Sequence, residues 1–385
     1  MFAIMLLSYS INAMDRQLFP VLATDVRRDF HFSLANIGLL STIFTLGMAV
    51  AGVPTGYLAA RFSRKAVLQM GIAIFSAGTA LTAFSHGFPD MLIYRAATGL
   101  GETMQLTVMF TIAANYFVRY RGAAIGSINF CYGIGAIIGP IFGTWLLTHY
   151  GTWRVPMIVF GAMGFGAIAV MWLVVRPWFS ETQRAVEEQS ARTGAAALLN
   201  RNTILLTIMS VFGGLIIYSF LGMYPVFLRE FLKYTPTAAG KITAFYGLGA
   251  LVSIGGGWVG DRFSPRLVMS AAFFATAVIG YLIFHGSAAF AFQATLTCLF
   301  GVIASGIIYV NLAAYHVKAV ESTLASGASG IFVTSLYTSA AISGYLMGAI
   351  AHRFGWVIAG EIEIVLYAII GGVLSLALRA DEMST

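Results

Sequence analysis

The sequence predicts an all-α membrane protein in which twelve transmembrane helices form two pseudo-symmetric six-helix bundles. Three features predict this architecture: a strongly apolar composition, twelve long apolar runs and an internal repeat at half the chain length. Of the 385 residues, 59% are hydrophobic and only 10% are charged, and the mean hydropathy is +0.84. A soluble protein of this size needs a surface far richer in Lys, Arg, Asp and Glu, so the composition excludes that class.

The apolar residues gather in runs that are long enough to cross a bilayer, for which a helix needs about 20 mostly apolar residues. We expect twelve spans, at 2–24, 34–60, 66–85, 89–117, 122–149, 154–176, 203–228, 236–260, 267–285, 288–315, 323–351 and 355–378. Asp15 and Arg16 interrupt the first run and eleven more runs follow it. The first run is therefore predicted to be a spanning helix rather than a cleaved signal peptide.

The basic residues lie in short clusters between the apolar runs, and the two sides of the membrane differ in how many they carry. If the even-numbered connections face the cytoplasm, thirteen lie on that side: Arg61, Arg64, Lys65, Arg119, Arg121, Arg176, Arg184, Arg192, Arg201, Arg262, Arg266, Lys318 and Arg379. Six lie on the other side: Arg27, Arg28, Arg154, Arg229, Lys233 and Arg353. Cytoplasmic loops carry the excess of Lys and Arg, so we expect a multi-pass protein of the cell (inner) membrane with both termini cytoplasmic. The net charge of +7 then reflects topology, and we expect no nucleic-acid partner.

A polar stretch at about 177–202 divides six spans from six. We therefore expect an N-terminal bundle over 1–178, a cytoplasmic linker over 179–202 and a C-terminal bundle over 203–385.

The two halves share a motif in the loop after their second span. Residues 56–65 read Gly-Tyr-Leu-Ala-Ala-Arg-Phe-Ser-Arg-Lys, and residues 257–266 read Gly-Trp-Val-Gly-Asp-Arg-Phe-Ser-Pro-Arg. Arg-Phe-Ser thus recurs with an offset of 201 residues. Transporters built from two related halves bind their substrate between the halves, near the middle of the bilayer.

These loops resemble the signature loops of the major facilitator superfamily, and Gly133, Gly135, Gly139 and Pro140 of the fifth span resemble its glycine–proline motif. The resemblance covers essentially the whole chain and implies the major facilitator fold. It also implies that loop charges gate the cytoplasmic side, with Asp261 opposite Arg119 or Arg121; the gating residues we expect are Asp261, Arg262, Arg61, Arg121 and Glu321. Ala60 stands where the family pattern usually has Asp, which puts the latch of the first half in doubt. Alternatively, these residues only set the topology.

Four charged residues lie inside predicted spans of the first half: Asp15 and Arg16 in span 1, and Arg95 and Glu102 in span 4. A charge within the bilayer costs at least a few kcal/mol, so such residues usually face a cavity, form pairs and carry function. Adjacent residues point about 100° apart on a helix, so we expect Arg16 to reach into the central cavity and Asp15 to face a neighbouring helix. Arg95 and Glu102 share one helix face, and span 4 packs near span 1 in this fold, which allows a contact between Asp15 and Arg95.

The two kinds of side chain suit different tasks. Arg16 stays charged and its planar guanidinium can bind a carboxylate through two hydrogen bonds, so it suits an anion ligand. Burial and a neighbouring guanidinium shift the pKa of a carboxyl group in opposite directions, so Glu102, placed between these effects, suits a group that loads and releases a proton. The alternative is a fixed charge network that only packs the bundle.

The segments 12–16 and 95–102 resemble the anion–cation symporter family, which includes bacterial organic-anion symporters. Tyr218, seven residues before Pro225, resembles that family's aromatic residue in span 7. The resemblance implies that Arg16 binds the substrate carboxylate and that Asp15 and Glu102 carry protons. We expect Arg95 to belong to a charge network. Spinster-like transporters share the Asp-Arg of span 1 and the Gly-x-Gly-Glu of span 4, so the substrate class stays open.

Polar and aromatic residues in other spans are candidates for the cavity wall. The substrate-binding residues we expect are Arg16, Tyr218, Asn129, Tyr132 and Tyr337; further candidates are Thr42, Thr45, Gln105, Tyr246, Tyr309, Asn311 and Thr334.

Glu361 and Glu363 in the twelfth span are predicted to be unpaired and have no assigned role. Two cysteines and six histidines form no metal-binding or catalytic motif, so we predict neither an enzyme nor a metal site.

The sequence thus predicts a secondary active transporter that works by alternating access and takes up a small organic anion, a carboxylate, with protons. The alternative is an exporter or antiporter of lipid-like or drug-like substrates, of the Spinster or drug-antiporter type. We expect no cofactor other than the proton gradient, and as partners the anion, protons and the lipid bilayer. We expect the protein to be a monomer.

Overall fold

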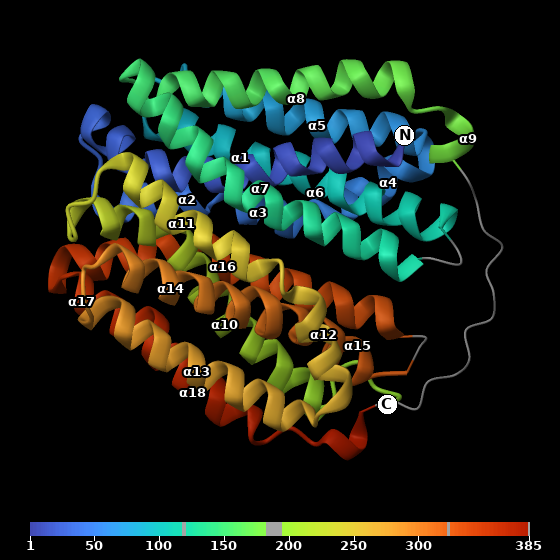
Figure 1. Cartoon of the computed structure of the whole chain (residues 1–385). Coiled ribbons are helices and arrows are strands. Elements are labelled where there is room, and N and C mark those ends of the chain that lie inside the picture. The colour runs from blue at the N-terminus through green and yellow to red at the C-terminus, as the bar shows by residue number, and fades with distance from the viewer. Residues whose placement is uncertain (118–120, 182–194, 322–323, 384–385) are drawn as a thin grey trace.

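The computed structural model describes residues 1–117, 121–181, 195–321 and 324–383. Its helices form two halves, with the first half of the chain (blue to green) above the second half (yellow to red) in Figure 1. Both termini lie at the same end of the molecule, as an even number of spans requires. Most of the predicted linker falls in 182–194, outside the described residues.

Each predicted span of the first half coincides with one helix or with a broken helix. The elements are α1 (Phe2–Phe30), α2 (Leu34–Thr42), α3 (Phe44–Val50), α4 (Gly52–Arg61), α5 (Arg64–Thr82), α6 (Phe88–Tyr116), α7 (Arg121–Tyr150), α8 (Arg154–Val174) and the short α9 (Pro177–Ser180).

The second half follows the same plan. The elements are α10 (Arg201–Glu230), α11 (Pro236–Ala250), α12 (Ser253–Arg262), α13 (Pro265–His285), α14 (Phe290–Phe300), η1 (Gly301–Tyr309), α15 (Val310–Lys318), α16 (Ala325–Phe354), α17 (Trp356–Gly360), η3 (Glu361–Leu366), α18 (Tyr367–Ser375) and η4 (Ala380–Glu382). η1 and η3 are π-helical turns within the tenth and twelfth spans, which the apolar pattern did not predict.

Eight helices of the described chain are long and apolar enough to cross a membrane, and α11 with α12 makes a ninth that is bent by 44°. The other three predicted spans are α1, α6 and the broken series α2, α3 and α4. Asp15 and Arg16 lie in α1, and Arg95 and Glu102 lie in α6. Polar side chains inside these two helices lower their mean hydropathy.

Small residues hold α3 against α6, the helix that carries two of the buried charges. A Cβ atom on Gly99 would collide with the backbone carbonyl of Phe44, and one on Gly47 would collide with that of Ala96. Backbones can approach this closely only where the interface residues are small. The contact fixes the position of α6 relative to the second span.

The two halves meet along two seams of the same kind, α2 with α16 and α7 with α11. In the first seam, Gly38 and Gly344 face each other so closely that a Cβ atom on either would strike the other's carbonyl oxygen. Beside them, the Thr42 hydroxyl donates a hydrogen bond to the Ala341 carbonyl across the seam, at 2.9 Å. In the second seam, Gly240 leaves no room for a side chain against Thr144.

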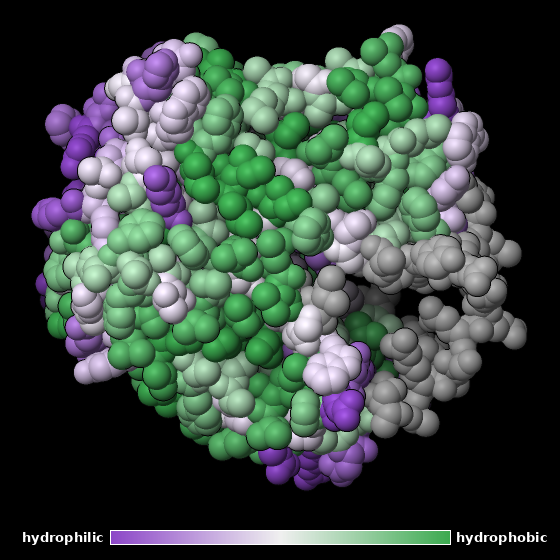
Figure 2. Space-filling model, in the orientation of Figure 1, coloured by the Kyte–Doolittle hydropathy of each residue, from purple (hydrophilic) through white to green (hydrophobic). Residues whose placement is uncertain are grey.

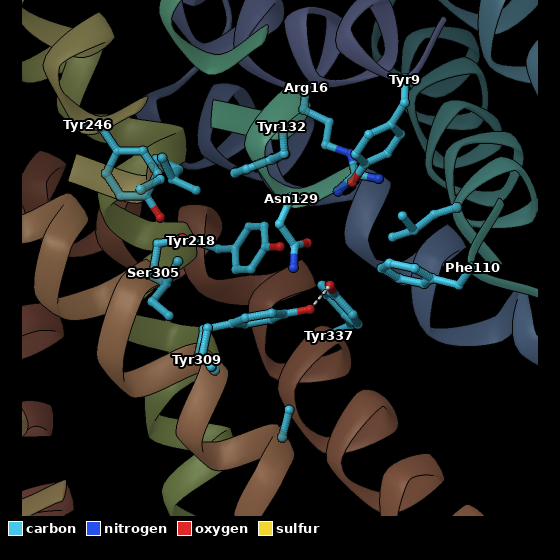
Figure 3. A pocket seen from close by; sticks show the side chains of 16 residues that line it. Tyr9, Arg16, Phe110, Asn129, Tyr132, Tyr218, Tyr246, Ser305, Tyr309 and Tyr337 are labelled. Atoms are coloured by element: carbon cyan, nitrogen blue, oxygen red, sulfur yellow. Dashed lines mark hydrogen bonds between the residues drawn. The ribbon is translucent and has the colours of Figure 1, made fainter. Parts of the chain in front are cut away.

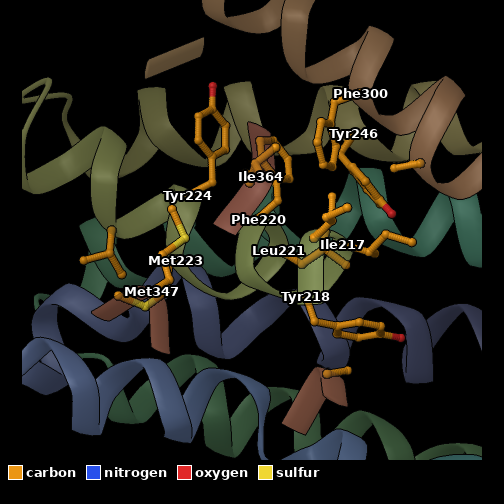
Figure 4. Packing of buried hydrophobic residues seen from close by; sticks show 14 of the residues in the cluster. Ile217, Tyr218, Phe220, Leu221, Met223, Tyr224, Tyr246, Phe300, Met347 and Ile364 are labelled. Atoms are coloured by element: carbon orange, nitrogen blue, oxygen red, sulfur yellow. The ribbon is translucent and has the colours of Figure 1, made fainter. Parts of the chain in front are cut away.

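An aromatic core holds α10 in the second half. The ring of Phe220 stacks on those of Phe300 and Tyr224, with centroids 4.0 and 4.4 Å apart. The Tyr224 hydroxyl donates to Gln293 Oε1 at 3.0 Å and accepts from the Thr297 hydroxyl at 2.9 Å. Figure 4 shows Tyr218 pointing away from this cluster, towards the first half.

The outer surface is apolar. In Figure 2 green hydrophobic residues cover most of the visible face, and purple hydrophilic residues gather towards its margins. Large apolar side chains such as Trp172, Leu173 and Ile93 are more than half exposed. Such a surface needs lipid rather than water around it.

Replacing Gly344 by Val should separate α2 from α16, because the new side chain has no space against Gly38. We expect spin labels at Arg28→Cys, in the last turn of α1, and Lys233→Cys, just after α10, to move apart in a double electron–electron resonance measurement. Cys131 and Cys298 are first replaced by Ser. The control is Gly330→Val in the same helix, where a Cβ atom meets nothing within 4 Å. Equal label distances in both variants would show that this seam does not hold the halves together.

Candidate functional site

A cavity of about 320 Å³ lies between the two halves. Its wall in the first half comes from α1, α6 and α7 and consists of Tyr9, Arg16, Leu106, Phe110, Asn129 and Tyr132. The polar wall residues of the second half come from α10, α11, η1 and α16 and are Tyr218, Tyr246, Ser305, Tyr309 and Tyr337. Figure 3 shows that these side chains converge from both halves on one space.

All five residues that the sequence predicted to bind substrate line this cavity: Arg16, Tyr218, Asn129, Tyr132 and Tyr337. Tyr246 and Tyr309 line it too, whereas Thr42, Thr45, Gln105 and Asn311 are buried outside it and Thr334 is exposed. The sequence did not single out Tyr9 or Ser305. Both lie in strongly apolar runs and have no charged neighbour in the sequence, so only the arrangement of the helices brings them to the wall.

Arg16 is the cation of the cavity wall, and its ion-pair partner is Glu102. Its Nε donates to Glu102 Oε2 at 2.9 Å, and the two side chains are 8% and 1% exposed. The Arg16 Nη2 atom has no hydrogen-bond partner in the part of the chain that the structure describes. Arg16 also lies 6.0 Å from the centre of the Tyr132 ring. Glu102 therefore occupies one edge of the guanidinium and leaves hydrogen-bonding capacity on the rest.

Polar residues of α1 and α6 form a chain beside this ion pair. Asn12 Nδ2 donates to Gln105 Oε1 at 2.9 Å and to the Glu102 carbonyl at 3.3 Å. Gln105 Nε2 in turn donates to the Ser8 hydroxyl at 2.9 Å. These bonds join α1 to α6 on one side of the ion pair, towards the start of α1, and help to fix the separation of Arg16 and Glu102.

Asp15 points away from the cavity, as the angle between adjacent helix residues predicted. Its Oδ2 accepts a hydrogen bond from the Thr79 hydroxyl of α5 at 2.7 Å, and the side chain is 1% exposed. The contact between Asp15 and Arg95 that the sequence allowed is not an ion pair among the described residues. Asp15 thus joins α1 to the third span, behind the cavity wall.

Arg95 is buried between aromatic rings. Its guanidinium carbon lies 4.9 Å from the centre of the Phe19 ring and 5.6 Å from that of Phe44, and the residue is 1% exposed. None of its three nitrogens has a hydrogen-bond partner in the described residues. Ring faces attract cations, and Arg95 does not line the cavity.

Tyrosines form the wall opposite Arg16. The hydroxyls of Tyr309 and Tyr337 share a hydrogen bond of 2.9 Å. The ring of Tyr218 lies 6.0 Å from that of Tyr337, at a steep angle, and 6.1 Å from that of Phe44 in the first half. Tyr218 therefore joins the two halves next to the cavity.

The twelfth span carries two acidic residues that do have partners, so the prediction that they are unpaired was wrong. Glu363 is fully buried, and its Oε2 accepts a hydrogen bond from the Ser219 hydroxyl at 2.7 Å. Glu361 Oε1 lies 3.1 Å from His285 Nε2. Sequence periodicity could not place these partners because they come from other spans, α10 and α13.

No ion pair joins the predicted gating residues to one another among the described side chains. Asp261 accepts a hydrogen bond from Lys318 of its own half at 2.9 Å. Arg61 and Arg262 lie over aromatic rings of their own helices, Tyr57 and Trp258. Glu321 has a backbone hydrogen bond to Ala195, and no ion pair joins it to Arg61 among the described residues. Arg119 and the side chain of Arg121 lie outside the described residues.

The ion pairs that join the halves lie at the opposite end, where α1 and α10 end. Arg229 binds Asp25, and Arg27 Nη1 lies 2.8 Å from Glu230 Oε2. We call these four residues the ion-paired end. From the sequence only Arg27 and Arg229 were counted, as loop charges, because no local pattern shows that the ends of the first and seventh spans meet.

The family model described as Major Facilitator Superfamily matches residues 5–344. The chain belongs to the major facilitator superfamily. It is therefore a multi-pass membrane transporter with the all-helical fold of that superfamily, and not an enzyme. The described residues contain no group of three or more His, Cys, Asp or Glu that could hold a metal ion.

Three comparisons place this major facilitator protein among its relatives. It is 29% identical to Protein spinster of Drosophila melanogaster over 200 residues, which make up 51% of this chain; the chain spans 33% of that protein's length. It is 26% identical to the hexuronate transporter of Bacillus subtilis over 322 residues, covering 78% of this chain and 76% of the relative. A crystal structure of a bacterial homolog of the human lysosomal transporter Spinster, inward-facing and unoccupied, superimposes with a TM-score of 0.79 at 16% identity, over 98% of this chain and 95% of that one. This last likeness supports the fold.

Reversing one charge at the ion-paired end should separate the halves there. In Arg229→Asp, two carboxylates face each other where the structure has a bond to Asp25. Because the Arg229 side chain is only 6% exposed, we expect a stronger effect than the 0–1 kcal/mol of a surface pair: about a tenfold rise, or more, in the separated population. The readout is the label distance between Arg28→Cys and Lys233→Cys.

The double exchange Asp25→Arg with Arg229→Asp should restore the original distance, because it restores the pair with its partners exchanged. Arg353→Glu, on the exposed end of α16, is the matched control for added negative charge. A double exchange that behaves like the single variant would mean that these residues do not act through each other.

Proposed function

We propose that the chain carries a small organic anion, a carboxylate, together with protons. The observation that carries this proposal is the ion pair between Arg16, in the wall of a cavity between the halves, and the buried Glu102. A fixed cation beside a titratable acid is the minimum set of groups through which an anion and a proton can influence each other.

The coupling follows from competition for one guanidinium. While Glu102 is ionised, it neutralises Arg16, and a second carboxylate gains little by approaching. When Glu102 takes up a proton, the charge of Arg16 loses its partner in a site shielded from water, where an unpaired charge is costly. A substrate carboxylate can then replace Glu102 as that partner. Each ligand therefore strengthens binding of the other, and the coupling is reciprocal.

Asp15 and Arg95 have supporting positions in this scheme. Neither Asp15 nor Glu102 lines the cavity, but Glu102 forms an ion pair with Arg16, which does. We therefore assign the coupling proton to Glu102 and keep Asp15 as a second titratable group. Arg95 contacts Phe19 and Phe44 and does not line the cavity, and we assign it to the charge network of the bundle rather than to the substrate.

Movement of the halves would expose the site to each side in turn. The seams of small residues and the ion-paired end hold one end together, and these contacts must separate for the other state to form. We propose that both termini face the cytoplasm, so that the ion-paired end faces outwards. Asp261, Arg262, Arg61, Arg121 and Glu321 would then approach each other in the alternate state.

The similarity to the hexuronate transporter over 78% of this chain supports an anionic substrate, because hexuronates are carboxylates. The second candidate function is transport of a lipid-like substrate. Two observations favour it: the similarity to Protein spinster and the apolar residues in the cavity wall, which are Leu106, Phe110, Ile217 and Leu221. Binding of a lysolipid that does not depend on Arg16 would favour this candidate.

Arg16→Gln should abolish carboxylate binding and uptake in proteoliposomes, because no other cation lines the cavity among the described residues. Arg353→Gln, on the exposed end of α16, is the matched control and should transport normally. Normal uptake by a folded Arg16→Gln variant would show that Arg16 does not bind the substrate.

Glu102→Gln should retain exchange of substrate across the membrane but lose accumulation driven by a pH gradient. The amide is similar in shape to the protonated acid and cannot release a proton. Counterflow of labelled substrate measures exchange, and uptake with acid outside measures accumulation. If the variant still accumulates substrate against its gradient, Glu102 is not the coupling site.

A further inference from the structure

We infer that the cavity is built for an aromatic carboxylate, an acid group on a flat ring, rather than for a sugar acid or a lipid. The inference rests on the proposed function as an anion carrier and names the substrate class of the same site. Three properties of the wall support it: its charge, its rings and its small number of other polar groups.

The charge of the wall fits one carboxylate. Arg16 is the single charged side chain that lines the cavity in the described chain. Its Nε is bound to Glu102, while Nη2 has no hydrogen-bond partner. Arg95, a buried cation of α6, is 1% exposed against two aromatic rings and does not line the cavity. A ligand with one acid group can therefore be neutralised here, whereas a second acid group would find no cation.

Aromatic rings surround this cation from both halves. Six tyrosines line the cavity: Tyr9, Tyr132, Tyr218, Tyr246, Tyr309 and Tyr337. Figure 3 shows Tyr132, Tyr218 and Tyr309 around the space next to Arg16. Flat rings pack against other rings in offset-stacked or edge-to-face arrangements that add attraction beyond the buried area. A planar ligand could contact both halves at once, which a carrier needs if its substrate is to alter how the halves move.

Few polar groups other than the phenols are available to a sugar ring. Apart from Arg16 and the phenols, the polar wall residues in the described chain are Asn129 and Ser305. The phenols of Tyr309 and Tyr337 already bond to each other. A buried hydroxyl without a hydrogen-bond partner opposes binding, and a sugar acid would bring several of them. The cavity volume of about 320 Å³ is also at the small end of the range for ligand sites, which suits a ligand of one or two rings.

The test compares four probes by titration calorimetry on the purified full chain: benzoate, cyclohexanecarboxylate, benzamide and glucuronate. Benzoate and cyclohexanecarboxylate differ in aromaticity at nearly equal size, and benzoate and benzamide differ in charge. We expect benzoate to bind about 2- to 10-fold more tightly than cyclohexanecarboxylate, which is the range that ring–ring contacts supply. We expect benzamide and glucuronate to bind more weakly than either.

Variants locate the preference in the wall. Tyr218→Leu should remove the preference for benzoate over cyclohexanecarboxylate, whereas Tyr218→Phe should keep it because the ring remains. Tyr309→Leu makes the same change from another helix if Tyr218→Leu does not fold. Tyr345→Leu, on an exposed part of α16, is the matched control and should bind like the unaltered protein.

The outcomes distinguish a failure of the aromatic substrate class from a failure of the proposed function as an anion carrier. If cyclohexanecarboxylate binds as tightly as benzoate, or glucuronate binds more tightly, the aromatic class is wrong while the anion carrier stands. If benzamide binds as tightly as benzoate, or if no carboxylate binds at all, the proposed function is wrong as well.

Discussion

The ion pair between Arg16 and Glu102 is the interaction on which the functional architecture depends. Both side chains are at least nine-tenths buried and lie 2.9 Å apart. Neither charge is stable alone in a low-dielectric site, because removing one partner leaves the other unpaired at a penalty of several kcal/mol. The pair can therefore separate only when something replaces each partner: a proton on Glu102 and an anion on Arg16. That requirement turns a buried ion pair into a coupling device.

The rest of the bundle keeps this pair at the boundary between the halves. Hydrogen bonds from Asn12 and Gln105 fix α1 against α6, and Thr79 holds Asp15 on the far side of α1. Tyr218, Tyr309 and Tyr337 bring the second half to the same cavity. Contacts between the halves include small residues and two ion pairs. Such contacts can form and separate without unfolding either half, so the equilibrium between two states responds to ligands in the cavity.

Sequence alone predicted the spans well, because each needs a long apolar run whatever its partners are. It also predicted that Arg16 faces the cavity while Asp15 does not, since the helix angle fixes that relation. It missed the ion-paired end, the partner of Glu363 and the wall position of Tyr9, because each depends on which helices meet. The π-helical turns in η1 and η3 escaped prediction because π-helical and α-helical turns present similar apolar patterns.

The number of protons taken up per bound anion tests the coupling most directly. Calorimetry of benzoate binding in buffers of different ionisation enthalpy gives this number. At a pH where Glu102 is ionised in the free protein, about one proton per anion is expected, and none in Glu102→Gln, because linkage requires binding to raise proton affinity. Anion binding without proton uptake at any pH, or equal uptake in Glu102→Gln, would contradict the role of the ion pair.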